Sequence, residues 1–376
     1  MKKKILFAVK NMNIGGVEKS LLSLLNTMDQ EQYEVDLLLL EDYGGYMKEI
    51  PQWVNVIVWE DFAELKTALD GSPVDAVLKY IKRGRIGRAA DLLLGWQQYK
   101  KTGDFSFYYK SVFRKVEKLK GRYDVAVAYS SINGYLTWLL NHYVDAERRV
   151  GWIHFEINKM YIDKRFMLTL HKPMDKIYIV SPSSYEMFVS QFPELEAKCE
   201  VRYNVVDEAA VKYLANEKVE NIRADDALTI VTLGRLTNQK RQDIIPEVVA
   251  KLQQQGEKVK WYLIGEGGIR GKIEENCKKY GVEDSVILLG LKSNPYPYLK
   301  QADLYVQTSA YEGYCIALAE ARVFGLPCVA TEFSGAHEQL DGRENSYVVN
   351  LDTEEIADAI LKVAASLKGA QNGNNT

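Results

Sequence analysis

The chain has 376 residues, of which 47% are hydrophobic and 26% are charged, and its formal net charge is −3. That length suits two domains rather than one core, and the composition is that of a folded soluble protein, which excludes disordered and fibrous classes. The four cysteines form no CxxC pair and lack metal-ligand spacing, so we expect a reducing, cytoplasmic location and no metal site. No apolar run is long enough for a signal peptide or a membrane-spanning helix.

The N-terminal half alternates apolar strands with helical segments. Residues 4–9 form an apolar run that enters a turn at Gly15 and Gly16 and then a segment with helical spacing of leucines. Strand, glycine turn and helix are the start of a βαβ unit. Further strands are predicted at 35–40, 54–59, 125–129, 149–154 and 177–180. Fully apolar strands of this kind are typical of a parallel sheet covered on both faces.

Residues 79–122 break that alternation with an insertion rich in basic and aromatic residues. It holds thirteen Lys and Arg against three acids, so its local net charge is 13 − 3 = +10. Its aromatic residues are Trp96, Tyr99, Phe105, Phe107, Tyr108, Tyr109 and Phe113. Basic side chains beside aromatic ones suit an anionic membrane surface. The alternative is a set of solvated helices whose aromatic side chains pack on the domain. No recognition motif accompanies the charge, and we expect no nucleic-acid partner.

The C-terminal half alternates more cleanly after a polar stretch at 216–226. Strands are predicted at 228–233, 259–264, 286–289, 304–308, 328–330 and 347–349. Two such runs predict an α/β protein of two Rossmann-like domains that face each other across a cleft. We place the first domain at 1–204, with the insertion at 79–122, and the second at 205–368. The polar residues 369–376 are expected to be a disordered tail.

Residues 311–327 carry the most informative pattern, two glutamates around the start of a helix. Glu312 follows the strand at 303–308, Glu320 lies about two turns into the helix at 316–324, and Gly325 begins the helix stop. A helix N-terminus favours phosphate, and ionised carboxylates accept hydrogen bonds from paired sugar hydroxyls. The arrangement suits a ligand with an anionic middle and hydroxyl groups at both ends.

Two further strand ends of the second domain carry candidate binding residues. Gly234 and Arg235 follow its first strand, with Lys240 soon after, and the two cations could bind a diphosphate and stabilise it as a leaving group. They could also be surface charges. The glycines of Gly265-Glu266-Gly267 follow the next strand, where they allow close approach to a nucleotide or simply make a turn. A dinucleotide fingerprint would need glycine where Arg270 stands, which disfavours an NAD-dependent enzyme.

In the first domain, Gly16 and His154 end two predicted strands. Gly16 could leave room for a diphosphate or an acceptor, although a plain turn fits equally well. A lone histidine is more often structural, but the position of His154 at a strand end favours function. Serine-hydrolase and P-loop signatures are absent, and no Asp-x-Asp pair is present to hold a metal against a diphosphate.

Six motifs give the chain a family resemblance. They are GGVEKSLLSLL near the start, WIH at 152, RYNVVD at 202–207, LGRLTNQK at 233–240, LIGEGG at 263–268 and SAYEGYCIALAEARVFGLPCVAT at 309–331. In order and spacing the chain resembles retaining glycosyltransferases of the GT-B fold, in the large group 4 family. The last motif matches that family's Glu-x7-Glu pattern.

The resemblance implies a nucleotide-sugar donor bound mainly by the second domain. Glu312 would contact donor sugar hydroxyls, Glu320 would hold the ribose diol, and Arg235 and Lys240 would hold the diphosphate. The remaining donor-binding positions that it implies are Gly16, Gly234, Gly265, Glu266, Gly267, Gly313, Tyr314, Cys315 and Ile316. His154 would lie near the donor sugar. The family commonly has phenylalanine and proline where this chain has Tyr314 and Cys315.

From these observations we expect a retaining, metal-independent glycosyltransferase without a resident cofactor. Its donor would be a UDP-sugar rather than a GDP-sugar, and its acceptor a glycan or lipid-linked molecule in cell-surface polysaccharide or glycoconjugate synthesis. The insertion at 79–122 adds an expected peripheral location at the inner face of the cell membrane. The alternative is a non-catalytic, glycosyltransferase-like subunit that binds an active transferase.

Overall fold

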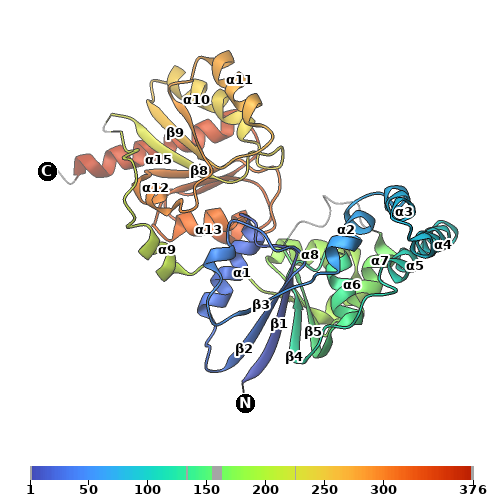
Figure 1. The fold of residues 1–376 in the computed structure, drawn as a ribbon. Coiled ribbons are helices and arrows are strands. Elements are labelled where there is room, and N and C mark those ends of the chain that lie inside the picture. The colour runs from blue at the N-terminus through green and yellow to red at the C-terminus, as the bar shows by residue number, and fades with distance from the viewer. Residues whose placement is uncertain (1, 133, 155–162, 225, 374–376) are drawn as a thin grey trace. The chain divides into compact units, whose positions relative to one another are not determined.

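The computed structural model describes residues 2–132, 134–154, 163–224 and 226–373. The chain divides into two compact units, Met1–Tyr203 and Asn204–Thr376, one residue from the boundary expected from the sequence. Each unit is a parallel sheet with helices between its strands (Figure 1). The expected class of two Rossmann-like α/β domains is therefore confirmed.

Unit 1 contains a seven-stranded parallel sheet with the order β3-β2-β1-β4-β5-β6-β7. Its strands are β1 (Lys3–Val9), β2 (Tyr33–Leu39), β3 (Asn55–Val58), β4 (Arg122–Ala128), β5 (Asp145–Ile153), β6 (Lys176–Ile179) and β7 (Cys199–Val201). Its α-helices are α1 (Gly16–Thr27), α2 (Phe62–Asp70), α3 (Pro73–Lys82), α4 (Ile86–Thr102), α5 (Ser106–Val112), α6 (Gly134–Tyr143), α7 (Lys164–His171) and α8 (Pro182–Gln191). The 3₁₀ segments are η1 (Met47–Glu49) and η3 (Pro193–Lys198).

The insertion forms most of the helical layer α3 to α5. Its aromatic side chains pack inward: Tyr108, Tyr109 and Phe113 are buried in the core of unit 1, and Trp96 and Phe105 pack against that core. Phe105 lies 5.3 Å from the ring of Phe166 on α7. Packing on the domain thus accounts for these aromatic residues.

Unit 2 contains a six-stranded parallel sheet with the order β10-β9-β8-β11-β12-β13. Its strands are β8 (Leu228–Leu233), β9 (Val259–Ile264), β10 (Val286–Gly290), β11 (Leu304–Gln307), β12 (Cys328–Thr331) and β13 (Tyr347–Val349). Its helices are α9 (Glu208–Leu214), the 3₁₀ segment η4 (Gln242–Ile244), α10 (Ile245–Gln254), α11 (Arg270–Tyr280), α12 (Tyr296–Gln301), α13 (Ile316–Arg322), α14 (Ala336–Leu340) and α15 (Thr353–Gly373).

Both faces of this sheet are covered, because successive strand residues point to opposite faces. On β8, Ile230 belongs to one buried cluster with residues of α10, α11 and α15. The next residue, Val231, belongs to another cluster with residues of α9, α12, α13 and α14. This arrangement explains why the strands are apolar on both sides in the sequence.

The order of the strands also fixes where a ligand would bind. The chain runs from β8 to β9 and β10 on one side, and then returns to place β11 on the other side of β8. The carboxyl ends of β8 and β11 therefore flank the point where the winding reverses. In open α/β sheets, ligands bind at this position.

Two features of the fold differ from the sequence expectations. The short strand β7 was not expected, because its sequence, Cys-Glu-Val, contains no apolar run. The expectation of a disordered tail from residue 369 is wrong for 369–373, which continue helix α15, whereas 374–376 lie outside the described residues. Among the residues that the structure describes, none of the helices has the length and hydropathy needed to cross a membrane.

Candidate functional site

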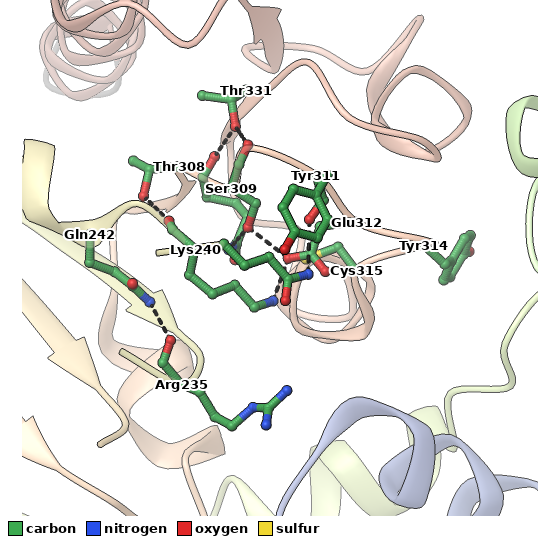
Figure 2. Close-up of polar contacts among 12 residues, drawn as sticks. Arg235, Lys240, Gln242, Thr308, Ser309, Tyr311, Glu312, Tyr314, Cys315 and Thr331 are labelled. Carbon is green, nitrogen blue, oxygen red and sulfur yellow. Dashed lines mark hydrogen bonds and ion pairs between the residues drawn. The ribbon is translucent and has the colours of Figure 1, made fainter. Parts of the chain in front are cut away.

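An ion pair lies where the winding of unit 2 reverses. Lys240 comes from the loop after β8 and Glu312 from the loop after β11, and the Lys240 Nζ contacts Glu312 Oε1 (Figure 2). The side chains are 15% and 9% exposed. Burial favours the neutral amine, but the Glu312 carboxylate outweighs that effect, so the pKa of Lys240 is raised above its ordinary value. Lys240 is thus held in its charged form.

A row of hydrogen bonds along β11 leads to the same carboxylate. Tyr305 Oη donates to Gln307 Oε1 at 2.5 Å, and Gln307 Nε2 donates to Ser309 Oγ at 2.7 Å. Ser309 Oγ then donates to Glu312 Oε1 at 2.6 Å. Tyr305, Gln307 and Ser309 are fully buried. These polar groups fix the position of Glu312 within an otherwise apolar sheet.

The two oxygens of Glu312 differ in their contacts. Lys240 and Ser309 both bind Oε1. Within the described part of the chain, no hydrogen bond to Oε2 is found. Since an ionised carboxylate only accepts hydrogen bonds, this second oxygen can accept one from a hydroxyl-bearing ligand.

Backbone contacts hold the loop around Glu312 and the loop around Lys240 together. Thr308 Oγ1 donates to the carbonyl of Lys240 at 2.8 Å, and the amide of Ala310 donates to the carbonyl of Gln239 at 2.7 Å. Gln239 Nε2 donates to the carbonyl of Tyr311 at 3.0 Å. The two loops that carry Lys240 and Glu312 are therefore hydrogen-bonded to each other in addition to being joined by the ion pair.

The first residues after Glu312 form a tight turn into helix α13. Cys315 precedes the helix with φ of 59°, a left-handed conformation that is uncommon for a residue with a side chain. Gln339 Nε2 donates to the carbonyl of Tyr314, and this contact supports the turn. Burial, followed by the nearby Glu312 charge, raises the pKa of the Cys315 thiol to about 12, so the thiol remains protonated. Figure 2 shows the Tyr314 ring directed away from the ion pair.

The other predicted site residues of this turn are Gly313 and Ile316. Gly313 is buried between Glu312 and Tyr314, and Ile316 is the first residue of α13. The helix has no side-chain cap at its N-terminus. The first N–H groups of a helix have no acceptor within the helix itself, and here no side-chain cap takes that place.

Glu320 lies on α13 and is 7% exposed. It accepts a hydrogen bond of 2.7 Å from the hydroxyl of Tyr296, the first residue of α12. Glu320 thus forms a second polar position, in helix α13 rather than in the loop that carries Glu312. A tyrosine that the sequence interpretation did not select holds it there.

Arg235 is exposed and is held through its backbone. Gln242 Nε2 donates to the carbonyl of Arg235 at 3.0 Å, and no dashed line joins the guanidinium group to the other residues drawn in Figure 2. Arg235 and Lys240 therefore differ: one cation is exposed to solvent, and the other is buried in an ion pair.

The glycines after β8 and β9 are explained by backbone packing. A Cβ atom added at Gly265 would lie 2.0 Å from the carbonyl oxygen of Gly234, and one at Gly267 would lie 2.2 Å from that of Leu236. Both Gly234 and Gly265 also have φ near +150°, at 148° and 147°. The two strand-end loops thus require glycine in order to approach each other. Glu266 is exposed and pairs with Arg270.

Gly16 and His154 belong to unit 1. Gly16 is the first residue of α1, and His154 follows β5. Tyr129 lies between them: its ring is 4.7 Å from that of His154, and its hydroxyl is 2.9 Å from Ser20 Oγ on α1. His154 is buried and also stacks on Trp152.

The structure thus brings Lys240, Glu312 and the turn at 313–316 together. It adds Ser309, Gln307, Tyr305 and Tyr296, which the sequence interpretation did not select. Polar residues within an apolar strand could have revealed Gln307 and Ser309. Among the described residues, no group of three or more His, Cys, Asp and Glu side chains is arranged to hold a metal ion.

Comparisons with known proteins agree with this geometry. Residues 227–366 match the family described as glycosyl transferases group 1. The chain is 27% identical over 194 residues to the N-acetylgalactosamine-N,N'-diacetylbacillosaminyl-diphospho-undecaprenol 4-alpha-N-acetylgalactosaminyltransferase of Campylobacter jejuni, a match that covers 51% of each chain. It is 29% identical over 133 residues to the poly(ribitol-phosphate) alpha-N-acetylglucosaminyltransferase of Staphylococcus aureus, covering 35% of this chain and 27% of the relative.

The fold has close counterparts among solved structures. The structure of Anabaena HepE (Alr3699) in complex with UDP and glucose matches with a TM-score of 0.68 at 18% identity, covering 98% of this chain and 91% of that one. The matched segments span 51% and 27% of the length of the two curated relatives above. Residues 227–366 of unit 2 therefore match a group 1 glycosyl transferase domain, and the two units together have the GT-B fold.

Proposed function

We propose that this protein is a retaining, metal-independent glycosyltransferase that needs no resident cofactor. It transfers a hexosyl or N-acetylhexosaminyl group from a nucleotide-sugar, a UDP-sugar rather than a GDP-sugar, to a glycan or lipid-linked acceptor. The process is cell-surface polysaccharide or glycoconjugate synthesis, at the cytoplasmic side of the membrane. We also assign the chain to the group 4 family, on its Glu-x7-Glu pattern.

The buried pair of Lys240 and Glu312 is the observation that carries this proposal. It lies at the ligand-binding position of a doubly wound sheet, and it offers Oε2 of Glu312 as an acceptor. A sugar hydroxyl is the matching donor. The Lys240 ammonium and the exposed Arg235 supply positive charge for the two phosphates of the donor.

The proposed chemistry breaks the bond between C1 of the sugar and the diphosphate oxygen and forms a bond from C1 to the acceptor oxygen. The acceptor attacks from the face that the diphosphate leaves, and its proton passes to the departing phosphate oxygen. Lys240 and Arg235 stabilise the charge that develops on that leaving group. Glu312 positions the sugar, and His154 and Gly16 take the places implied by the family resemblance.

The known relatives support the substrate classes. The Campylobacter jejuni relative is named for a diphospho-undecaprenol acceptor, the Staphylococcus aureus relative for poly(ribitol-phosphate), and the HepE structure contains UDP. These names favour a UDP-sugar donor and a polymeric or lipid-linked acceptor for this chain as well.

A donor-hydrolysis screen with UDP- and GDP-sugars tests the proposal. We expect turnover of at least one UDP-sugar, unchanged by EDTA, and a loss of about 10²–10³-fold in kcat for Glu312→Gln, as for removal of one group that binds the transition state. Glu332→Gln, at an exposed glutamate of unit 2, is the matched control and should keep full activity. If no donor is turned over, and Glu312→Gln and the wild type behave alike, the proposal fails.

The same screen distinguishes the proposed enzyme from the alternative, a non-catalytic partner subunit. A non-catalytic subunit would bind UDP weakly or not at all in a thermal-shift assay and would hydrolyse no donor. The proposed donor site keeps Arg235, Lys240, Glu312 and Glu320, and the presence of these four charged residues favours the enzyme.

A further inference from the structure

Helices α3 and α4 of unit 1 expose an unusual number of aliphatic side chains. Among the described residues, ten Val, Leu and Ile side chains are exposed, and six of these lie on the two helices. The six are Val74 (63%), Leu78 (50%), Ile81 (50%), Ile86 (70%), Leu93 (44%) and Leu94 (60%). Single exposed aliphatic residues are common, but a cluster of six indicates a binding surface.

On α3 the exposed residues form one stripe. Val74, Leu78 and Ile81 are spaced by four and three residues, which places them on one face of a helix. Ala76 and Tyr80 lie on the opposite side, and together with Val77 they are buried in the core of unit 1. Helix α3 is therefore apolar on both its inner and its outer face.

Helix α4 repeats this pattern. Ala89 and Leu92 point into the core, while Ile86, Leu93 and Leu94 are exposed. The two helices follow each other directly and pack together. We call these six exposed side chains of the two packed helices the α3–α4 surface.

The α3–α4 surface lies in a strongly basic part of the chain. Residues 73–102 contain seven Lys and Arg and two acids, a net charge of 7 − 2 = +5. Lys82 and Arg83, at the end of α3, and Lys100 and Lys101, at the end of α4, are exposed. None of these four has an ion-pair partner in the part of the chain that the structure describes. Basic side chains around an exposed aliphatic face match an anionic, partly apolar partner.

A pocket of about 440 Å³ adjoins the start of α4. Arg85, Arg88 and Lys115 line it together with Asp61 and Glu64, and Glu64 pairs with both arginines. Arg88 is 9% exposed, and no hydrogen bond to its Nη1 is found among the described residues. The pocket borders Ile86, so a buried guanidinium donor lies beside the most exposed of the six aliphatic side chains.

We propose that the α3–α4 surface docks onto an anionic lipid membrane. The six aliphatic side chains enter the boundary between headgroups and acyl chains, and the four exposed cations and Arg88 meet lipid phosphates. Five aromatic residues of the insertion take no part, because they belong to the core of unit 1 or pack against it: Trp96, Phe105, Tyr108, Tyr109 and Phe113. This deepens the proposed function and rests on it in one respect: docking would bring the enzyme to a lipid-linked acceptor.

Vesicle sedimentation with purified full-length protein tests the docking. We expect binding to phosphatidylcholine vesicles that contain phosphatidylglycerol, and at least tenfold weaker binding to phosphatidylcholine alone. The variant Leu78→Asp/Ile86→Asp/Leu94→Asp should lose binding by at least tenfold. The matched control Leu291→Asp/Leu351→Asp changes exposed leucines of unit 2 and should bind like the wild type.

A charge-reversal series tests the electrostatic contribution to vesicle binding. Lys82→Glu/Arg83→Glu/Lys100→Glu/Lys101→Glu should abolish the preference for phosphatidylglycerol, whereas Lys218→Glu/Lys278→Glu, at exposed lysines of unit 2, should keep it. Both variants are checked for unchanged melting temperature, so that misfolding is not read as lost binding.

Three results would overturn the docking proposal. The first is that the wild type does not bind the anionic vesicles. The second is that the aspartate variant binds them as well as the wild type does. The third is that the wild type forms a dimer, which the aspartate substitutions dissociate, while neither protein binds vesicles. Donor hydrolysis without vesicles is measured in parallel. Hydrolysis without vesicle binding overturns only the docking, and vesicle binding without hydrolysis overturns only the proposed function.

Discussion

The Glu312 site of unit 2 and the α3–α4 surface of unit 1 depart from ordinary protein structure in opposite ways. The site buries two charged side chains and a row of polar ones in a sheet that is otherwise apolar. The surface exposes six aliphatic side chains in helices that already contribute to a core. Most proteins keep charges outside and avoid large exposed apolar patches.

The difference shows that each departure is compensated by a different kind of contact. In unit 2, the buried charges are paired and hydrogen-bonded within the unit, so the structure itself balances the cost of desolvation. In unit 1, the exposed aliphatic groups have no such partner within the described residues of the unit. The charges of the first region are therefore balanced within unit 2, whereas the aliphatic groups of the second region are suited to a partner. Two predictions test this difference, and a third concerns a buried histidine in the core of unit 1.

The largest effect is expected from breaking the buried ion pair. Lys240→Met leaves the Glu312 carboxylate buried without its cation and should lower the free energy of unfolding by about 3–5 kcal/mol, measured by urea denaturation. The exposed pair of Lys251 and Glu354 is the control, and Lys251→Met should cost less than about 1 kcal/mol.

The double variant Lys240→Met/Glu312→Gln sharpens this test. Because it removes both charges, it should be more stable than Lys240→Met alone. Equal losses for Lys240→Met and Lys251→Met would show that burial of the pair does not matter to stability.

The second prediction compares two leucines of α4. Leu92 is 2% exposed and Leu94 is 60% exposed. Leu92→Ala should lower the free energy of unfolding by about 2–5 kcal/mol, because it leaves a cavity in the core. Leu94→Ala should change it by less than about 0.5 kcal/mol. A large loss for Leu94→Ala would mean that the α3–α4 surface has a structural role within unit 1.

The smallest effect is a pH dependence from His171 in the core of unit 1. Its Nδ1 donates a hydrogen bond to the Met167 carbonyl at 3.0 Å, and its Nε2 is hydrogen-bonded to Ser131 Oγ at 3.2 Å. Burial lowers the pKa of His171 to about 4, from an ordinary value near 6.5. The unfolded chain therefore binds a proton below about pH 6.5 that the folded chain binds only near pH 4, and stability falls as the pH decreases through this range.

This difference should cost about 2 kcal/mol at pH 5 relative to pH 8. His171→Gln should remove that part of the pH dependence of the melting temperature, whereas the control His337→Gln, at an exposed histidine, should retain it. The same pH slope in wild type and His171→Gln would assign the effect to other groups.

The sequence predicts most of this fold, because burial on both faces produces apolar runs that are easy to recognise. β8 at Leu228–Leu233 and β9 at Val259–Ile264 have the same bounds as the apolar runs that predicted them. β7 escaped prediction because Glu200 interrupts a strand of only three residues. The end of α15 was misjudged because a polar composition does not stop a helix that is anchored by its earlier turns.

The site was predictable in part. Glu312 and Lys240 were both selected, but their direct contact joins loops 72 residues apart, and no local pattern encodes such a pairing. Likewise, the distant Tyr296 had no local signal connecting it to Glu320. Around the start of the insertion, the aromatic residues dominate the sequence pattern, whereas the regular spacing of Val74, Leu78 and Ile81 becomes evident only in a helical projection.

The unequal occupation of the two oxygens of Glu312 has a consequence for selectivity. Oε1 already accepts from Lys240 and Ser309, so a ligand at this position meets Oε2, an atom that can only accept. Deoxy and fluoro analogues of a sugar offer no hydrogen there. The position is therefore expected to discriminate by whether a hydroxyl is present rather than by the size of the substituent, and a missing hydroxyl would leave the carboxylate without its partner.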